Sequence, residues 1–256
     1  MRDAGVHRIP GRDDAWHTYD VGVRHGIATG APTYDPMFYT ADGIAEPTSQ
    51  TVTVPAGGSS EVAVTLGEDL GENGLIYGGW ITLTGPGEDL AVPYAGLSGD
   101  YQSLPVLDDQ GMGLPALGVS DGAGGVLLDP DGGHTYTMQG GDVPYLAYYL
   151  EYPAERLEMR AHRVNPAGTM TIVNPSVGLI DASDHLGRSA QPEVFGWDGN
   201  YSLKNQKSKT VGNGDYVLEM RVLKPLGDPQ DPDHWETFSS PQFTIADPEP
   251  PRPGVH

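Results

Sequence analysis

The hydrophobic positions between residues 75 and 100 predict a β-hairpin. Two apolar runs, residues 80–83 and 90–92, flank the turn-forming segment 85–89. Apolar runs on either side of such a turn are typical of paired antiparallel strands. Because proline has no N–H to donate to a ladder, Pro93 marks residues 93–97 as an edge strand or as the exit from the sheet.

Strict alternation predicts a strand over residues 61–66, with Val62, Val64 and Leu66 on one face. It also predicts a strand over 156–163, where the charged residues face water and three side chains are buried: Leu157, Met159 and Ala161. The composition of 156–163 would also fit a helix, but Pro153 and the β-rich surroundings favour a strand.

The strand predicted over residues 215–224 buries one apolar face: Tyr216, Leu218, Met220 and Val222. A further strand is expected over 16–24, with apolar side chains from Trp16, Tyr19, Val21 and Val23 and one break at Thr18. The remaining expected elements are a long loop over 26–50 with a short strand near 37–39, and strands over 125–128, 135–138, 144–152 and 238–245.

Many short strands separated by turns predict an all-β protein. The chain contains 36 Gly and 23 Pro, and its length of 256 residues is long for one sandwich. We expect two immunoglobulin-like or fibronectin-type-III-like β-sandwiches in tandem, over residues 1–102 and 103–247, followed by a Pro-rich tail over 248–256. The link between them is expected within 100–115.

The charge narrows the range of partners. Thirty-five acidic residues against 14 Lys and Arg give a net charge of −21, which argues against nucleic-acid and membrane-surface binding. No apolar run of about 18 residues predicts a membrane span, and the N-terminal residues lack the apolar core of a signal peptide. The chain has no cysteine, so disulfides and thiolate metal sites are excluded.

Three motifs in order resemble one known family. The hairpin motif joins residues 77–83, Tyr-Gly-Gly-Trp-Ile-Thr-Leu, to residues 90–96, Leu-Ala-Val-Pro-Tyr-Ala-Gly. Before it stands Thr-Val-Pro-Ala-Gly-Gly-Ser at 53–59, and after it come Trp197-Asp198-Gly199, Gly214-Asp215-Tyr216 and a segment from Trp235 to Phe243. Together they resemble the fibronectin-type-III-like domains that follow the catalytic domain in secreted subtilisin-like serine proteases of the lactocepin-like group.

The resemblance implies a non-catalytic accessory region of a secreted subtilisin-like endopeptidase. Its partner would be the catalytic domain of the same polypeptide. It would support or space that domain, and would help it to admit protein substrates or to contact the cell surface. The chain would then be a piece of a longer, extracellular protein, without cofactor. The family's catalytic motifs, D-[ST]-G, H-G-T and G-T-S-M, are not intact in the sequence, so we expect no peptidase activity from this chain.

Aspartates gather in three loops: Asp108-Asp109, Asp129-Pro130-Asp131, and Asp228 to Asp233. Calcium accepts six to eight oxygen ligands in irregular loops, so Asp129 with Asp131, or Asp228 with Asp231 and Asp233, form candidate calcium sites. None follows the EF-hand spacing, and solvated turns are the alternative interpretation. The eight histidines are scattered and predict no zinc site.

Residues 145–152 are rich in tyrosine. If they form one strand, Tyr145 and Tyr149 share one face, while Tyr148 and Tyr152 share the other. This division favours core packing on one side and contact with a neighbouring domain on the other. A sugar-stacking platform is the alternative, and it would make the chain a free-standing adhesion or carbohydrate-binding module. Trp197 is expected to be a core anchor at a turn.

Overall fold

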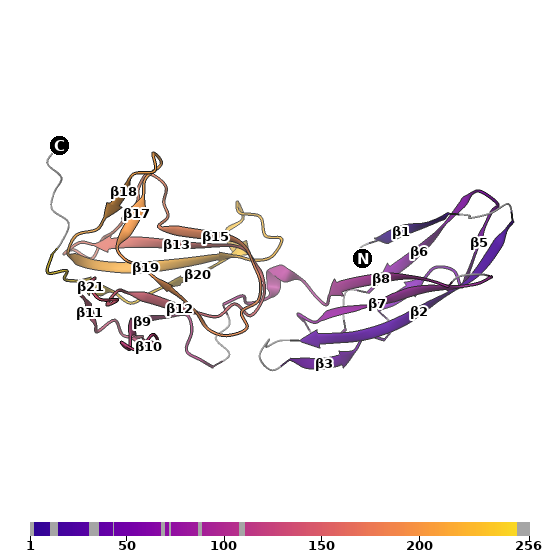
Figure 1. Ribbon diagram of the computed structural model, residues 1–256, viewed down its shortest axis with the longest axis horizontal. Coiled ribbons are helices and arrows are strands. Elements are labelled where there is room, and N and C mark those ends of the chain that lie inside the picture. The colour runs from indigo at the N-terminus through magenta and orange to yellow at the C-terminus, as the bar shows by residue number, and fades with distance from the viewer. Residues whose placement is uncertain are drawn as a thin grey trace. The chain divides into compact units, whose positions relative to one another are not determined.

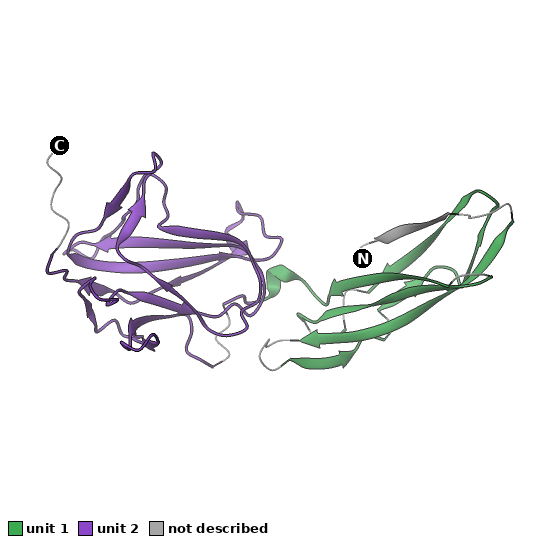
Figure 2. Ribbon diagram, in the orientation of Figure 1, with its two compact units in different colours: residues 1–104 green, residues 105–256 purple. Residues whose placement is uncertain are grey.

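The computed structural model describes residues 3–10, 15–30, 36–42, 44–67, 70–71, 73–86, 89–107 and 111–249, with the backbone alone for 3–10. The chain divides into two compact units, residues 1–104 and 105–256 (Figure 2). The described regular elements are strands and two short 3-10 helices, so the protein is all-β, as predicted. No helix in this described part is long and apolar enough to cross a membrane.

Unit 1 is a sandwich of two antiparallel sheets (Figure 1). One sheet has the order β1-β6-β4 and the other the order β3-β2-β7-β8, with β5 pairing the beginning of β2. The strands are β1 (Asp3–Pro10), β2 (His17–Gly30), β3 (Met37–Thr40), β4 (Ala45–Pro47), β5 (Thr51–Val54), β6 (Ser59–Leu66), β7 (Ile76–Thr84) and β8 (Leu90–Leu97), followed by the 3-10 helix η1 (Tyr101–Ser103).

The core of unit 1 lies between these sheets. Val62 and Val64 of β6 pack with Tyr77, Ile81 and Leu83 of β7, and all five side chains are buried. The alternation predicted for residues 61–66 is therefore confirmed. Among the described strands, β8 pairs with β7 alone and lies at the edge of this sheet, so the chain accommodates Pro93 on an edge strand as predicted.

The hairpin motif has a packing explanation. Tyr94 lies opposite Gly79 and Tyr77 lies opposite Gly96 in the β7–β8 register. A Cβ at either glycine would collide with the tyrosine ring across the strand pair. Two reciprocal tyrosine-over-glycine pairs thus require the glycines in this motif.

The predicted boundaries of β2 were wrong. The strand was expected over 16–24 with a loop from 26, but it runs on to Gly30. A bulge between His25 and Ala28 shifts its register against β7. The bulge inverts the alternation, so the sequence pattern is lost there. Trp16 lies outside the strand and is 71% exposed. The short strand near 37–39 is confirmed as β3, and β4 was not predicted.

Unit 2 contains a four-stranded sheet of order β10-β9-β12-β16 and a larger sheet of order β11-β21-β19-β13-β14, to which β15 and β20 add at β13 and β19. A two-stranded ribbon, β17-β18, completes it. The strands are β9 (Ala116–Ser120), β10 (Val126–Leu128), β11 (Thr135–Tyr136), β12 (Tyr145–Tyr148), β13 (Ala154–Val164), β14 (Met170–Ile172), β15 (Asp181–Leu186), β16 (Glu193–Gly196), β17 (Asn200–Ser202), β18 (Ser208–Thr210), β19 (Gly214–Leu223), β20 (Trp235–Ser239) and β21 (Phe243–Ile245), with the 3-10 helix η2 (Pro232–His234) before β20.

Aromatic side chains connect the two sheets of unit 2. Tyr136 is fully buried and its hydroxyl donates to the carbonyl of Gly118 in β9 at 2.9 Å. Trp197, just after β16, meets Tyr216 of β19 edge to face, with ring centroids 5.9 Å apart. The Tyr216 hydroxyl donates back to the carbonyl of Gly212 at 2.6 Å, an arrangement like the tyrosine corner of immunoglobulin-like sandwiches. Trp197 and Tyr216 of the third sequence motif are therefore part of the core.

Two further predictions for unit 2 are corrected by the structure. The strand expected over 238–245 is two strands, because Pro241 cannot donate to the ladder and Ser240 bonds to Leu218 between them. The strand expected over 144–152 ends at Tyr148. The boundary between the two units lies within the expected link, between residues 104 and 105. Directly after it, Val106 is buried and its N–H donates to Glu236 Oε1 at 2.7 Å.

Candidate functional site

The residues proposed for ligand or interdomain contact lie inside unit 2. Tyr149 is 1% exposed in a cluster with Leu114 and Ala116, and Trp197 is 2% exposed. Tyr145 is partly exposed, and its hydroxyl donates to the carbonyl of Gly141 at 3.3 Å. Because Tyr148 and Tyr152 are buried too, these tyrosines do not form an exposed platform on which a sugar could stack.

The candidate calcium residues cap turns. The Asp129 carboxylate accepts the N–H groups of Gly133 and His134, and Asp228 and Asp231 accept N–H groups two residues ahead. Among the residues that the structure describes, no group of three or more His, Asp or Glu is placed to hold a metal ion. These clusters are therefore better explained as Asx-type turns, while Asp108-Asp109 lies outside the described residues.

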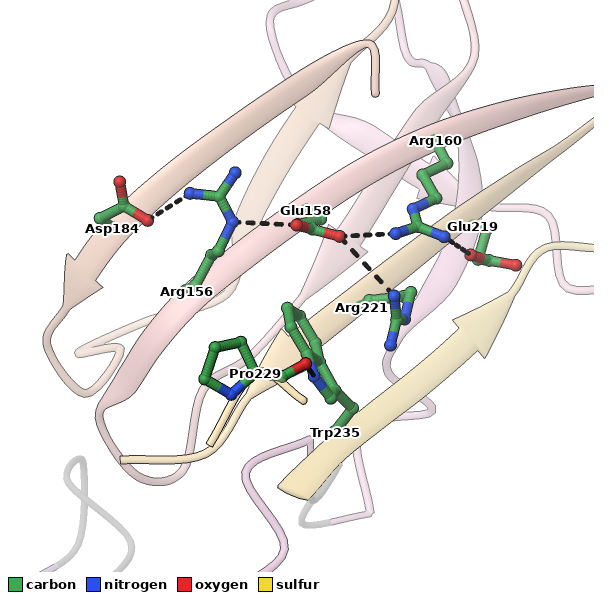
Figure 3. A network of polar contacts seen from close by, with 8 residues as sticks. All are labelled: Arg156, Glu158, Arg160, Asp184, Glu219, Arg221, Pro229 and Trp235. Carbon is green, nitrogen blue, oxygen red and sulfur yellow. Dashed lines mark hydrogen bonds and ion pairs between the residues drawn. The ribbon is translucent and has the colours of Figure 1, made fainter. Parts of the chain in front are cut away.

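A network of charges crosses the larger sheet of unit 2 on the face opposite the buried Leu157 and Met159 (Figure 3). We call it the charged ladder, and its members are Asp184 of β15, Arg156, Glu158 and Arg160 of β13, and Glu219 and Arg221 of β19. The register explains it: Arg156 lies opposite Asp184, Glu158 opposite Arg221, and Arg160 opposite Glu219. Each pair joins opposite charges across neighbouring strands, which stabilises a sheet.

Glu158 is the centre of the charged ladder. Arg156 Nε donates to its Oε1 at 2.9 Å, Arg160 Nη2 donates to its Oε2 at 2.8 Å, and Arg221 Nη1 lies 3.8 Å from Oε2. Arg156 also donates to Asp184 at 2.6 Å. The expectation that the charged residues of 156–163 face water is therefore wrong for Glu158, whose residue is only 9% exposed.

The ladder balances its own charge. Three arginines face three carboxylates, so the group is neutral within a chain of net charge −21. The hydrogen bond to Glu158, opposed by partial burial and assisted by Asp184, raises the pKa of Arg156 above its ordinary value. A buried carboxylate is tolerated when it is paired and hydrogen-bonded in this way. The ladder thus stabilises the sheet more readily than it offers free groups to a ligand.

An aromatic contact extends the ladder to the edge of the sheet. The guanidinium of Arg221 lies 4.2 Å from the centre of the Trp235 ring, and Trp235 Nε1 donates to the carbonyl of Pro229 at 3.2 Å. Figure 3 shows Trp235 and Arg221 side by side.

Leu226, in the loop before η2, is 72% exposed and has a φ of 57°, a conformation unusual for a leucine.

A second buried charge lies elsewhere in unit 2. Glu151 is 1% exposed, and Arg188 donates to its carbonyl oxygen at 2.7 Å and to its Oε1 at 3.1 Å. Next to it, Glu193 accepts hydrogen bonds from Ser189 and from the Tyr148 hydroxyl. These contacts fix the segments around β12 and β16.

Unit 1 contains a cavity of about 380 Å³ between β2 and the segment around β4. Glu46 is the single ionisable residue among those that line it. Active sites bring several polar groups together, usually including a nucleophile with a base. Ser49 and Gln50 also line this cavity, but among the described side chains the Ser49 hydroxyl makes no hydrogen bond to the Glu46 carboxylate.

Sequence reasoning missed the charged ladder as a unit. The alternation of Arg, Glu and Arg along 156–160 was visible, but the pairing of Glu158 with Arg221 depends on the register between β13 and β19. It also missed a stacked pair on unit 1, in which the Arg24 guanidinium lies 4.3 Å from the centre of the Trp80 ring. These residues are 56 positions apart in sequence, so only the β2–β7 pairing brings them together.

Comparison with protein-family models matches residues 13–95 to an Fn3-like domain. A search of curated proteins finds no match. Similar solved structures include the CupB2 chaperone of Pseudomonas aeruginosa, with 8% identity, coverage of 93% of this chain and 92% of that chain, and a TM-score of 0.29. The E. coli chaperone DraB has 8% identity, coverage of 96% and 89%, and a TM-score of 0.26. These scores are too low to support an inference about function.

Proposed function

We propose that this chain is a non-catalytic accessory region of a secreted subtilisin-like serine endopeptidase. It supports and spaces a catalytic domain of the same polypeptide and assists access of protein substrates to it. The observation that carries the proposal is the overlap between the Fn3-like match over 13–95 and two motifs of the subtilase-like pattern, at 53–59 and 77–96. The fold alone would not license it, since sandwiches serve many functions.

The motif residues have structural roles. The glycines at 79 and 96 and the residues Trp197 and Tyr216 have packing roles, so they specify sandwiches and not a ligand site. The link to the protease rests on their order along the chain and on the family resemblance. An extracellular location belongs to the same proposal.

The first test is the native gene upstream of Met1. An open frame that contains D-[ST]-G, H-G-T and G-T-S-M is the expected result. A stop codon and a ribosome-binding site directly before Met1 would contradict the proposal and would favour a free-standing adhesion module.

The second test compares the full-length protein with a version from which residues 1–256 are deleted. Because an accessory region acts on stability and on large substrates, we expect the deletion to accelerate thermal inactivation and to lower casein cleavage more than cleavage of a short chromogenic peptide. The isolated chain should not be labelled by a serine-directed fluorophosphonate. A full-length variant lacking the catalytic serine is the control for labelling.

A further inference from the structure

The sheet β3-β2-β7-β8 of unit 1 has a core face and an outer face. Tyr77, Ile81 and Leu83 of β7 pack in the core, so the alternate residues Ile76 and Trp80 lie on the other side. Both of these side chains are 39% exposed. In Figure 1 this sheet lies across the core from β6, so its outer face is turned away from the rest of unit 1.

Large apolar side chains are exposed on this outer face. Phe38 of β3 is 65% exposed and Ile27 of β2 is 61% exposed, in addition to Ile76 and Trp80. The facing positions of β8 are also apolar, with Pro93 opposite Trp80. Exposed apolar patches of this kind mark interaction surfaces on soluble proteins.

A single cation stands among these residues. Arg24 lies opposite Trp80 in the register of β2 and β7, with its guanidinium 4.3 Å from the ring centre. It is the one Lys or Arg between Arg12 and Arg156 in the sequence. Within the part of the chain that the structure describes, no carboxylate forms an ion pair with it. We call this surface, formed by Ile27, Phe38, Ile76 and Trp80 around Arg24, the Arg24 face.

Charge indicates what could cover the Arg24 face. Burying an unpaired guanidinium is costly, so an occupant must provide a carboxylate or a comparable acceptor within an apolar surface. A second copy would bring another 21 negative charges, and such repulsion keeps proteins monomeric. A sugar is disfavoured because Arg24 already occupies one face of the Trp80 ring. Arginine and tryptophan at the centre of an apolar patch are instead the residues that dominate protein–protein contacts.

We propose that the Arg24 face is the surface by which unit 1 docks on the catalytic domain of the same polypeptide. That domain contributes an apolar patch with a carboxylate that binds Arg24. The inference rests on the proposed function for the existence of the domain, but the choice of face comes from this chain. Docking buries Trp80, Phe38 and Ile76 and pairs the isolated cation.

Hydroxyl-radical footprinting with mass spectrometry tests the face directly. The isolated 256-residue chain and the full-length protein are oxidised in parallel, and modification is measured at Trp80 and Phe38. We expect both to be protected in the full-length protein. Trp197, which is 2% exposed, and the partly exposed Trp235 provide internal references within unit 2 whose relative oxidation should not change.

Charge reversal provides the matched variants. Arg24→Glu in the full-length protein should shift the docking equilibrium by roughly 30-fold or more towards the undocked state, because it removes one partner of a buried charge pair, and Trp80 oxidation should return. The control Ala63→Glu adds a carboxylate at an exposed position of β6 and should leave Trp80 protected. Circular dichroism of the isolated Arg24→Glu chain checks that it folds.

Each outcome decides the inference. If the full-length protein has a catalytic domain but its Trp80 is oxidised as fast as in the isolated chain, the docking face is wrong and the proposed function stands. If no catalytic domain is encoded, the proposed function and this occupant fail together. If light scattering shows that the isolated chain dimerises and the dimer protects Trp80, the occupant is a second copy and the inference is overturned.

Discussion

The two units treat the outer face of their larger sheet in opposite ways. In unit 2 the charged ladder places three arginines against three carboxylates, and its central residue, Glu158, is hydrogen-bonded to two of them. In unit 1 the Arg24 face carries exposed apolar side chains and a cation without an ionic partner among the described residues. The charged groups of the first face pair with one another, while Arg24 on the second face requires an ionic partner from another surface. Charge on a sheet can therefore stabilise a fold or mark a contact, depending on whether the register supplies its partner.

The largest expected effect comes from breaking the centre of the charged ladder. Glu158→Gln removes the charge that Arg156 and Arg160 hydrogen-bond, and should destabilise unit 2 by about 2–3 kcal/mol. Denaturant unfolding followed by hydrogen exchange in each unit checks this, because unit 1 should keep its stability. Asp184→Asn is the control: its side chain is 56% exposed, so the loss should stay within about 1 kcal/mol. Equal losses for both variants would contradict a central role for Glu158.

The next largest effect should come from alkaline pH, which we expect to destabilise unit 2. Burial, and then the carboxylate of Glu193, raise the pKa of Tyr148 to about 12, above its unfolded value of about 10. Between these values the folded state holds the proton more tightly, so the stability of unit 2 is fully present below about pH 10 and falls as the pH rises towards 12. Burial also raises the pKa of Tyr136 and Tyr216.

Tyr148→Phe should flatten this alkaline loss without removing it. The measurement is guanidinium unfolding at several pH values above 9, followed by hydrogen exchange of β12 and β13 in unit 2. A variant whose stability falls with pH as steeply as that of the wild type would show that Tyr148 does not titrate as proposed.

A smaller effect is expected at the loop next to the ladder. Gly227 N donates to the carbonyl of Lys224 at 3.0 Å, which places Leu226 at the third position of a turn with a φ of 57°. Glycine usually occupies that position. Leu226→Gly should therefore stabilise unit 2 by about 0.5–1 kcal/mol, measured as a higher melting temperature. Leu127→Gly, in strand β10 and 60% exposed, is the matched control and should destabilise by a similar amount; the same sign for both would refute the strain argument.

The smallest effect should come from the Arg24 face in the isolated chain. Arg24→Gln removes one exposed cation–π contact and should change the free energy of unfolding of unit 1 by less than about 1 kcal/mol. Chemical denaturation followed by hydrogen exchange of β2 and β7 measures it. A loss as large as that of Glu158→Gln would mean that Arg24 stabilises the sandwich itself, and the contrast between the two faces would disappear.

Local patterns predicted much of the fold because the buried side chains of a strand recur at every second residue. The faces of 61–66 and 215–224 were predicted correctly, since Val62, Val64, Leu218 and Met220 need no knowledge of their neighbours to be recognised as core. The prediction failed where backbone geometry breaks the period. The bulge after His25 hid the second half of β2, and Pro241 divided one expected strand into two.

The candidate site was much less predictable than the fold. The tyrosines of 145–152 looked like a contact surface, but Tyr149 packs against Leu114 and Ala116, which the sequence does not place nearby. The aspartate clusters suggested calcium, and the sequence did not show that the carboxylates of Asp129, Asp228 and Asp231 cap the turns that contain them. In both cases the chemical type of the residue was clear and its surroundings were not.

Sequence alone was enough to establish the all-β class, the acidic charge and the motifs of an Fn3-like sandwich, because these depend on composition and on short-range alternation. The contacts of Glu158 with Arg221 and of Arg24 with Trp80 become visible only in the folded protein. The physical reason is that strand register is a long-range property: it is fixed by the burial of one whole face, and it then places every side chain on the other face.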